Sequence, residues 1–198
     1  MGQRDRMFKV LVVGDATVGK TSLVQRYAND SFNRHYKSTV GGERAPPAAR
    51  APELSWAPGQ ERFTSMTRLY YREASACVIM FDVTNISTFS NSQKWKQDLD
   101  SKLLLPDGSP VPCLLLANKC DLSPWAVTRE EVDRFSKENG FLGWVETSVK
   151  ENKNISESMR VLIEKMMCSS TGDGSASSAG SGDYIHLKEP PTPGWACC

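Results

Sequence analysis

The chain has 198 residues, of which 39% are hydrophobic and 24% are charged, with a formal net charge of +1. This composition supplies one core of ordinary size, and the balanced charge argues against a nucleic-acid-binding protein. No apolar run approaches the roughly 20 residues of a membrane-spanning helix, and the polar N-terminus does not resemble a signal peptide, so a cytosolic origin is expected.

Short apolar runs alternate with helical patterns along the chain. Residues 8–13 form an apolar run that ends at a glycine, which is typical of a buried strand, and a helix is predicted from 21 to 28. Two further buried strands are predicted at 76–81 and 113–117. Helical signals lie between and after them: Trp95, Leu99 and Leu103 at a spacing of four, a capping-box pair Thr128 and Glu131, and an apolar stripe over 155–166. Strands alternating with helices predict an α/β sheet covered on both faces.

The C-terminal segment 168–198 has a different composition. It is rich in Ser, Gly, Asp and Pro, which predicts a disordered tail with a span on the order of 30 Å. The tail ends in the pair Cys197-Cys198. Cysteines at the end of such a tail have no core to join, so they require a separate explanation.

The segment from Gly14 to Thr21 matches the pattern Gly-x4-Gly-Lys-Thr of a phosphate-binding loop. Its glycines allow backbone N–H groups to turn inward around phosphates. Lys20 is expected to reach the β- and γ-phosphates, and the Thr21 hydroxyl to bind Mg²⁺. Its position between a predicted strand and a predicted helix supports this interpretation over an incidental glycine-rich turn.

A second motif, Asn118-Lys119-Cys120-Asp121, follows the predicted strand 113–117. A carboxylate at Asp121 would accept hydrogen bonds from N1–H and the exocyclic amine of guanine, whereas N1 of adenine is itself an acceptor. Together with the later run 146–150, this favours GTP and GDP over adenine nucleotides. An ATP-using kinase with a phosphate-binding loop is therefore disfavoured.

These motifs resemble the Rab branch of the Ras-like small GTPases. The resemblance covers residues 7–41 and 59–167, and the segments Tyr70-Tyr71-Arg72 and Phe81-Asp82-Val83-Thr84 match Rab-type segments. It implies a P-loop NTPase fold, with a Ras-like G domain over 1–167 built on a mostly parallel sheet with helices on both faces. The implied activity is GTP hydrolysis by a monomeric switch that alternates between GDP-bound and GTP-bound forms.

The resemblance also assigns roles to individual residues. Gln60 is similar to the residue that orients the attacking water, and Thr21 and Thr39 to the ligands of Mg²⁺. Thr64 and Ser65 are candidate phosphorylation sites, although surface hydroxyls without that role are an equally good interpretation. The expected nucleotide contacts are Gly14, Asp15, Ala16, Thr17, Val18, Gly19, Lys20, Thr21, Ser22, Asn33, Arg34, His35, Tyr36, Lys37, Ser38, Thr39, Gly59, Asn118, Lys119, Asp121, Ser148, Val149 and Lys150.

The terminal pair Cys197-Cys198 resembles the double prenylation site of Rab proteins. One lipid chain binds membranes only marginally, and the tail has a single lysine, so two lipids are expected. The resemblance implies an exchange factor, an activating protein, a dissociation inhibitor or escort protein, and effectors as partners. It also implies the cytoplasmic face of trans-Golgi or endolysosomal membranes, with a cytosolic pool, and a role in vesicle trafficking.

One segment departs from the family. Between Gly41 and Gly59 the family has two paired strands that lead into an Asp-x-Ala-Gly-Gln motif, but residues 42–58 are rich in Ala, Arg and Pro. Four prolines remove ladder donors, so the second and third strands are expected to be missing or disrupted, with at most a short extended piece at 54–56. Trp56 or Ala57 stands where the family has the acid that supports Mg²⁺.

Two hypotheses therefore remain open. The first is a prenyl-anchored Rab switch in membrane trafficking. The second is an isoform, or a chain from a misassigned gene sequence, with impaired magnesium and nucleotide binding, which acts at most as an interaction protein. An abrupt block inside a close match favours an alternative exon or a shifted reading frame as its origin, over a genuine loop with its own binding role.

Overall fold

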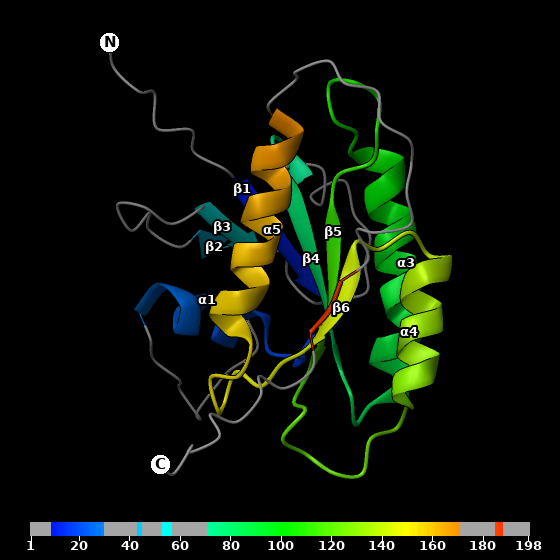
Figure 1. Ribbon diagram of the computed structural model, residues 1–198. Helices are drawn as coiled ribbons and strands as arrows, with labels where there is room; N and C mark the ends of the chain where they lie inside the picture. The colour runs from blue at the N-terminus through cyan, green and yellow to red at the C-terminus, as the bar shows by residue number, and fades with distance from the viewer. Residues whose placement is uncertain (1–8, 30–42, 45–52, 57–70, 171–184, 188–198) are drawn as a thin grey trace, which may run out of the picture.

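The computed structural model describes residues 9–29, 43–44, 53–56, 71–170 and 185–187 (Figure 1). In these ranges one sheet has the strand order β2-β3-β1-β4-β5-β6-β7. The strands are β1 (Lys9–Gly14), β2 (Glu43–Arg44), β3 (Glu53–Trp56), β4 (Ala76–Asp82), β5 (Cys113–Asn118), β6 (Gly143–Glu146) and β7 (Ile185–Leu187). The helices are α1 (Lys20–Asn29), α3 (Ile86–Lys102), α4 (Arg129–Glu138) and α5 (Ile155–Ser170).

The sheet separates two layers of helices. Helices α1 and α5 lie on one face, and α3 and α4 lie on the other (Figure 1). Alternate residues of β1 point to opposite faces, so Val10 and Val12 pack in the α1/α5 core while Leu11 and Val13 pack in the α3/α4 core. Burial on both faces explains why the central strands are continuous apolar runs.

Parallel pairing brings the functional ends of the strands together. Strands β1, β4, β5 and β6 pair in parallel, so their carboxyl ends lie at the same edge of the sheet. Those ends are Gly14, Asp82, Asn118 and Glu146. The predicted α/β fold, its central strands and the Thr128–Glu131 capping box are confirmed.

The second and third strands, expected to be missing or disrupted, are present but short. β3 pairs in parallel with β1, with Leu54 opposite Val10, and β2 pairs antiparallel with β3 over two residues. The short extended piece predicted beside the first strand is therefore present. Between the prolines, the run Glu53–Trp56 contains no proline and keeps every backbone donor needed for pairing.

Most of the segment 168–198 lies outside the described residues, and its two described parts belong to secondary structure. α5 continues to Ser170, and Ile185–Leu187 form β7, which pairs in parallel with β6. The composition of 168–198 predicts disorder because it is polar, but the apolar residues Ile185 and Leu187 give this short piece β propensity. No helix in the described ranges is long and apolar enough to cross a membrane.

Candidate functional site

The loop after β1 has the backbone conformation that a phosphate site requires. Gly14 and Gly19 have φ of +147° and +108°, in the region that glycine adopts most readily. A Cβ on Gly14 would lie 2.4 Å from the Met80 carbonyl oxygen, and one on Gly19 would lie 2.5 Å from Asn118 Nδ2. Both glycines are thus required by close approach of the neighbouring strands, and the loop delivers the chain directly to the N-terminus of α1, where backbone N–H groups favour anions.

Lys20 lies inside this loop. Its Nζ donates to the backbone oxygens of Gly14 at 2.7 Å and Asp15 at 2.5 Å. Burial lowers the pKa of Lys20 to about 8, and the Asp15 carboxylate opposes part of that shift. The hydrogen bonds of this buried ammonium go to neutral carbonyls, so negatively charged phosphate oxygens would stabilise it further.

Asn118 links the phosphate loop to the loop that follows β6. Its Nδ2 donates to the Val18 carbonyl at 2.7 Å, and its Oδ1 accepts from Thr147 Oγ1 at 3.2 Å and from the Val149 N–H at 3.3 Å. Asn118 is 2% exposed, so these bonds form in a buried setting. In this structure the side chain fixes three segments relative to one another.

Asp121 carries the carboxylate expected to recognise guanine. Ser148 Oγ donates to Asp121 Oδ1 at 2.7 Å, which ties the guanine-motif carboxylate to the run 146–150. Oδ1 has one acceptor position occupied in this way, so the orientation of the carboxylate is set before a base arrives. Pre-orientation of a hydrogen-bonding group favours discrimination between bases.

Lys119, inside the same motif, is held by Asp82 at the end of β4. Its Nζ lies 2.7 Å from Asp82 Oδ2, while Thr84 donates to Asp82 Oδ1 through both its N–H and its hydroxyl. Burial by itself raises the pKa of Asp82, but the hydrogen bonds from Lys119 and Thr84 outweigh it and hold the pKa below its usual value. Lys119 has a φ of +64°, in the left-handed region that residues other than glycine seldom adopt.

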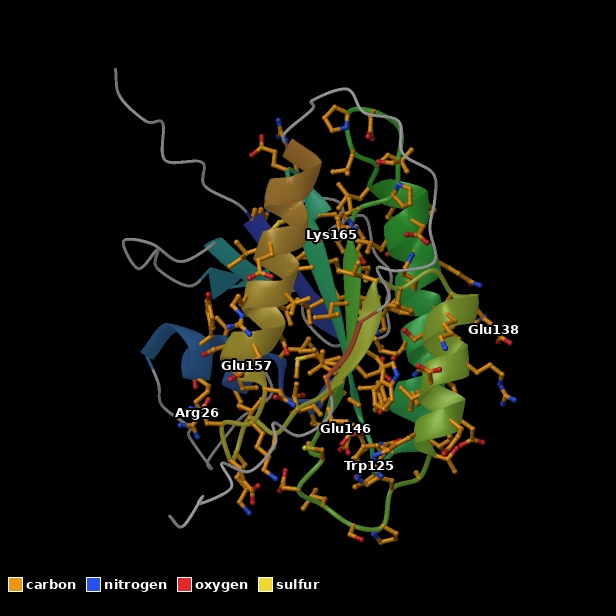
Figure 2. The ribbon with its side chains drawn as sticks, viewed as in Figure 1. Arg26, Trp125, Glu138, Glu146, Glu157 and Lys165 are labelled. Atoms are coloured by element: carbon orange, nitrogen blue, oxygen red, sulfur yellow. The ribbon has the colours of Figure 1, made fainter. Side chains whose placement is uncertain are left out.

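Two arginines, one on α1 and one on α4, hold the segment 146–150. Arg26 of α1 donates to the carbonyls of Val149 and Lys150 at 3.1 Å each. Arg129 of α4 binds the carboxylate of Glu146 through two nitrogens, at 2.6 and 3.2 Å, and lies 4.3 Å from the Trp125 ring centre. Figure 2 shows Arg26, Trp125 and Glu146 at the same end of the domain.

The structure brings many of the predicted nucleotide residues into this site. It places Gly14 to Thr21, Asn118, Lys119, Asp121, Ser148 and the backbone of Val149 and Lys150 at the carboxyl edge of the sheet, and Ser22 in the first turn of α1. The Asp15 carboxylate is directed to α3. The predicted site residues that lie outside the described ranges are Asn33, Arg34, His35, Tyr36, Lys37, Ser38, Thr39, Gly59, Gln60, Thr64, Ser65, Cys197 and Cys198.

Thr21 carries the hydroxyl that is expected to bind the magnesium ion. Thr21 is 7% exposed and follows Lys20 at the start of α1. No group of three His, Cys, Asp or Glu side chains in the described ranges is arranged to hold a metal. The Thr21 hydroxyl is an oxygen donor, the kind of ligand that Mg²⁺ prefers together with phosphate and water.

Glu53 cannot replace the missing acid of the family. It is the first residue of β3 and is paired with Lys9, the first residue of β1. Parallel strands rise about 3.3 Å per residue, so Glu53 starts about 16 Å from the level of Gly14. The carboxyl end of β3, which faces the nucleotide edge, is Trp56.

Comparisons with known proteins agree with this geometry. The Ras family model matches residues 9–168. Ras-related protein Rab-7L1 of Homo sapiens is 69% identical over 210 aligned residues that cover all of both chains, and Ras-related protein Rab-32 of Homo sapiens is 46% identical over 83% of this chain and 76% of its own. The chain belongs to the Rab family of Ras-like small GTPases.

Family membership fixes the general chemistry of this Rab GTPase. It binds GTP and GDP, with Mg²⁺ as the ion of its family, and it is a GTP hydrolase. When bound, Mg²⁺ supplies positive charge to the β- and γ-phosphate oxygens. The groups of this chain that are expected to serve this chemistry are the Lys20 ammonium, the Thr21 hydroxyl, the loop N–H groups and the Asp121 carboxylate. Two further runs, at 64–69 and 123–125, resemble the Rab-seven-like branch of the family, and the similarity to Rab-7L1 agrees with that resemblance.

Sequence patterns missed several supports of this GTPase site. The spacing of Trp95 with Leu99 and Leu103 predicts a buried indole ring on a helix, but it does not predict that the indole N–H donates to Asp15. Asp82 could be noticed only as part of a Rab-type segment, and no local signal identifies Arg26 or Arg129. Their partners lie far away in sequence, so only the fold pairs them.

Proposed function

We propose that this chain is a membrane-anchored Rab switch in vesicle trafficking. The observation that supports nucleotide switching best is the buried Asn118 side chain, which joins the phosphate loop to both guanine-recognition loops. A site pre-assembled in this way requires little reorganisation to bind a guanine nucleotide. Exchange factors, activating proteins and effectors are the partners expected for such a switch.

Membrane attachment would use Cys197 and Cys198 with a prenyl group on each. Two chains give stable attachment where one gives only marginal binding. An escort or dissociation inhibitor would cover these lipids in the cytosolic pool. The trans-Golgi or endolysosomal system is the proposed home membrane.

Nucleotide binding tests the switch directly. Titration of the purified chain with mant-GDP, with and without Mg²⁺, should give saturable binding and preference over mant-ADP. Absence of saturable binding would reject the switch for this chain and leave the interaction-protein alternative. The short β2 and β3, and Trp56 at the end of β3, are the observations that favour this alternative.

Membrane attachment needs a separate experiment. The full chain, Cys197→Ser, Cys198→Ser and the double variant would be expressed in cells and separated into membrane and cytosolic fractions. The double variant should be entirely cytosolic and each single variant mostly so. Equal membrane fractions for all four proteins would contradict prenylation at these cysteines without affecting the conclusion on nucleotide binding.

A further inference from the structure

Asp15 places a carboxylate in the loop that must bind phosphates. An acid beside a triphosphate opposes binding, unless its charge is directed elsewhere and its hydrogen bonds are satisfied. Here both carboxylate oxygens accept hydrogen bonds from donors on α3. Asp15 Oδ2 accepts from Asn91 Nδ2 at 2.7 Å, and Oδ1 accepts from Trp95 Nε1 at 2.9 Å.

The two donors are fixed by α3. Asn91 and Trp95 are four residues apart and therefore lie on the same face of the helix. Trp95 is 2% exposed and packs in the α3/α4 core, so its N–H cannot easily follow a moving loop. The helix thus offers a rigid two-point anchor for the Asp15 carboxylate.

The backbone of Asp15 contacts Lys20, the residue of the loop that is expected to bind phosphate. Its carbonyl oxygen accepts from Lys20 Nζ at 2.5 Å, beside the Gly14 carbonyl at 2.7 Å. A rotation of Asp15 would displace the carbonyl that positions the lysine. The side chain and the main chain of one residue therefore connect α3 to the phosphate-binding ammonium.

We propose that Asp15 is a positioning residue for nucleotide binding, anchored by Asn91 and Trp95, that fixes the phosphate loop and keeps its own charge turned away from the phosphates. This role goes beyond a general structural contact between α3 and β1. It concerns the binding of guanine nucleotide, which family membership establishes, and is independent of the trafficking role.

Asp15→Ala distinguishes this role from a purely electrostatic one, because the two roles predict opposite changes in GDP binding. Removing a negative charge near the phosphates should tighten GDP binding if charge alone matters. Loss of positioning should instead speed mant-GDP release by about tenfold, the scale of a lost hydrogen bond to a charged group. Unchanged or slower release from Asp15→Ala would overturn the proposal.

Trp95→Phe removes the indole donor and keeps an aromatic ring, and Trp144→Phe is its matched control. Trp144 Nε1 also donates to a carboxylate, Asp133 Oδ1 at 3.1 Å, and lies in the same core but away from the loop. Trp95→Phe should speed mant-GDP release, while Trp144→Phe should lower only the melting temperature. Equal release rates for the two variants would overturn the proposal.

Two further readouts separate positioning from loss of stability. The ³¹P resonance of the β-phosphate of bound GDP should shift in Asp15→Ala and Trp95→Phe and not in Trp144→Phe. In the double variant of Asp15 and Trp95 the second substitution should add little, because both remove the same anchor. Fully multiplicative effects, or an unshifted β-phosphate resonance, would contradict a shared positioning role.

Discussion

The hydroxyl of Ser148 donates to Asp121 Oδ1 at 2.7 Å, so a residue 27 positions further along the chain orients the carboxylate expected to read guanine. The contact joins the loop after β5 to the loop after β6. Base recognition therefore depends on the packing of two strands and not on Asp121 alone.

Ser148→Ala should weaken discrimination between GDP and IDP, which lacks the exocyclic amine. The freed carboxylate can rotate, so part of its interaction with the amine is lost, with an expected cost of about 1 kcal/mol in GDP affinity. Competition of GDP and IDP against mant-GDP measures the ratio. Ser148→Thr keeps the hydroxyl and serves as the control, and an unchanged ratio in Ser148→Ala would contradict the orienting role.

The pKa of Lys20, lowered by burial to about 8, predicts a pH dependence of nucleotide affinity. In the free protein the ammonium loses its proton above about pH 8, whereas bound phosphates favour the protonated form. Binding then takes up a proton, so affinity for GDP should fall as pH rises above 8, by up to about tenfold per pH unit.

The matched variant for this prediction is Lys20→Met, which should bind GDP weakly with little pH dependence over the same range. Mant-GDP titrations from pH 6.5 to 9.5 provide the comparison. If the full chain and the variant respond to pH in parallel, another group is responsible.

Trp56 at the end of β3 predicts that Mg²⁺ slows GDP release less than it would with an acid at this position. Trp56→Asp should restore outer-shell support and increase the ratio of mant-GDP release rates measured in EDTA and in Mg²⁺, by about tenfold if one charge-assisted hydrogen bond is regained. Trp56→Asn introduces a side chain with the shape of Asp but without its charge, so it should increase this ratio of release rates less. Equal ratios in all three proteins would show that the missing acid is not the limiting feature.

The pairing of β7 with β6 predicts protection of the sheet edge by the tail. Hydrogen exchange of the full chain should be slower over Gly143–Glu146 than in a variant with His186→Pro, because proline removes a ladder donor and disfavours the strand. His186→Ala is the control and should retain the protection. Identical exchange in all three would mean that β7 contributes no lasting pairing in solution.

The sequence was sufficient to predict the α/β fold, the phosphate loop and guanine selectivity, because each depends on short-range patterns. Two glycines and a lysine at fixed spacing define a loop, and apolar runs between helical patterns define buried parallel strands. The short β2 and β3 were less predictable, since prolines disfavour pairing while a neighbouring strand edge rewards it. β7 was not predicted because it lies in a polar segment and its partner β6 is distant in sequence.

What only the tertiary structure decided is how this site is held together. The sequence places Asp15, Asn118 and Glu146 in three separate motifs, but their partners Trp95, Thr147 and Arg129 come from other elements. Hydrogen bonds and ion pairs act over about 3 Å, so they form only after the sheet aligns its carboxyl ends. The residues expected to bind guanine nucleotide can therefore be recognised from short segments of the sequence, while the rigidity of the site arises from long-range packing.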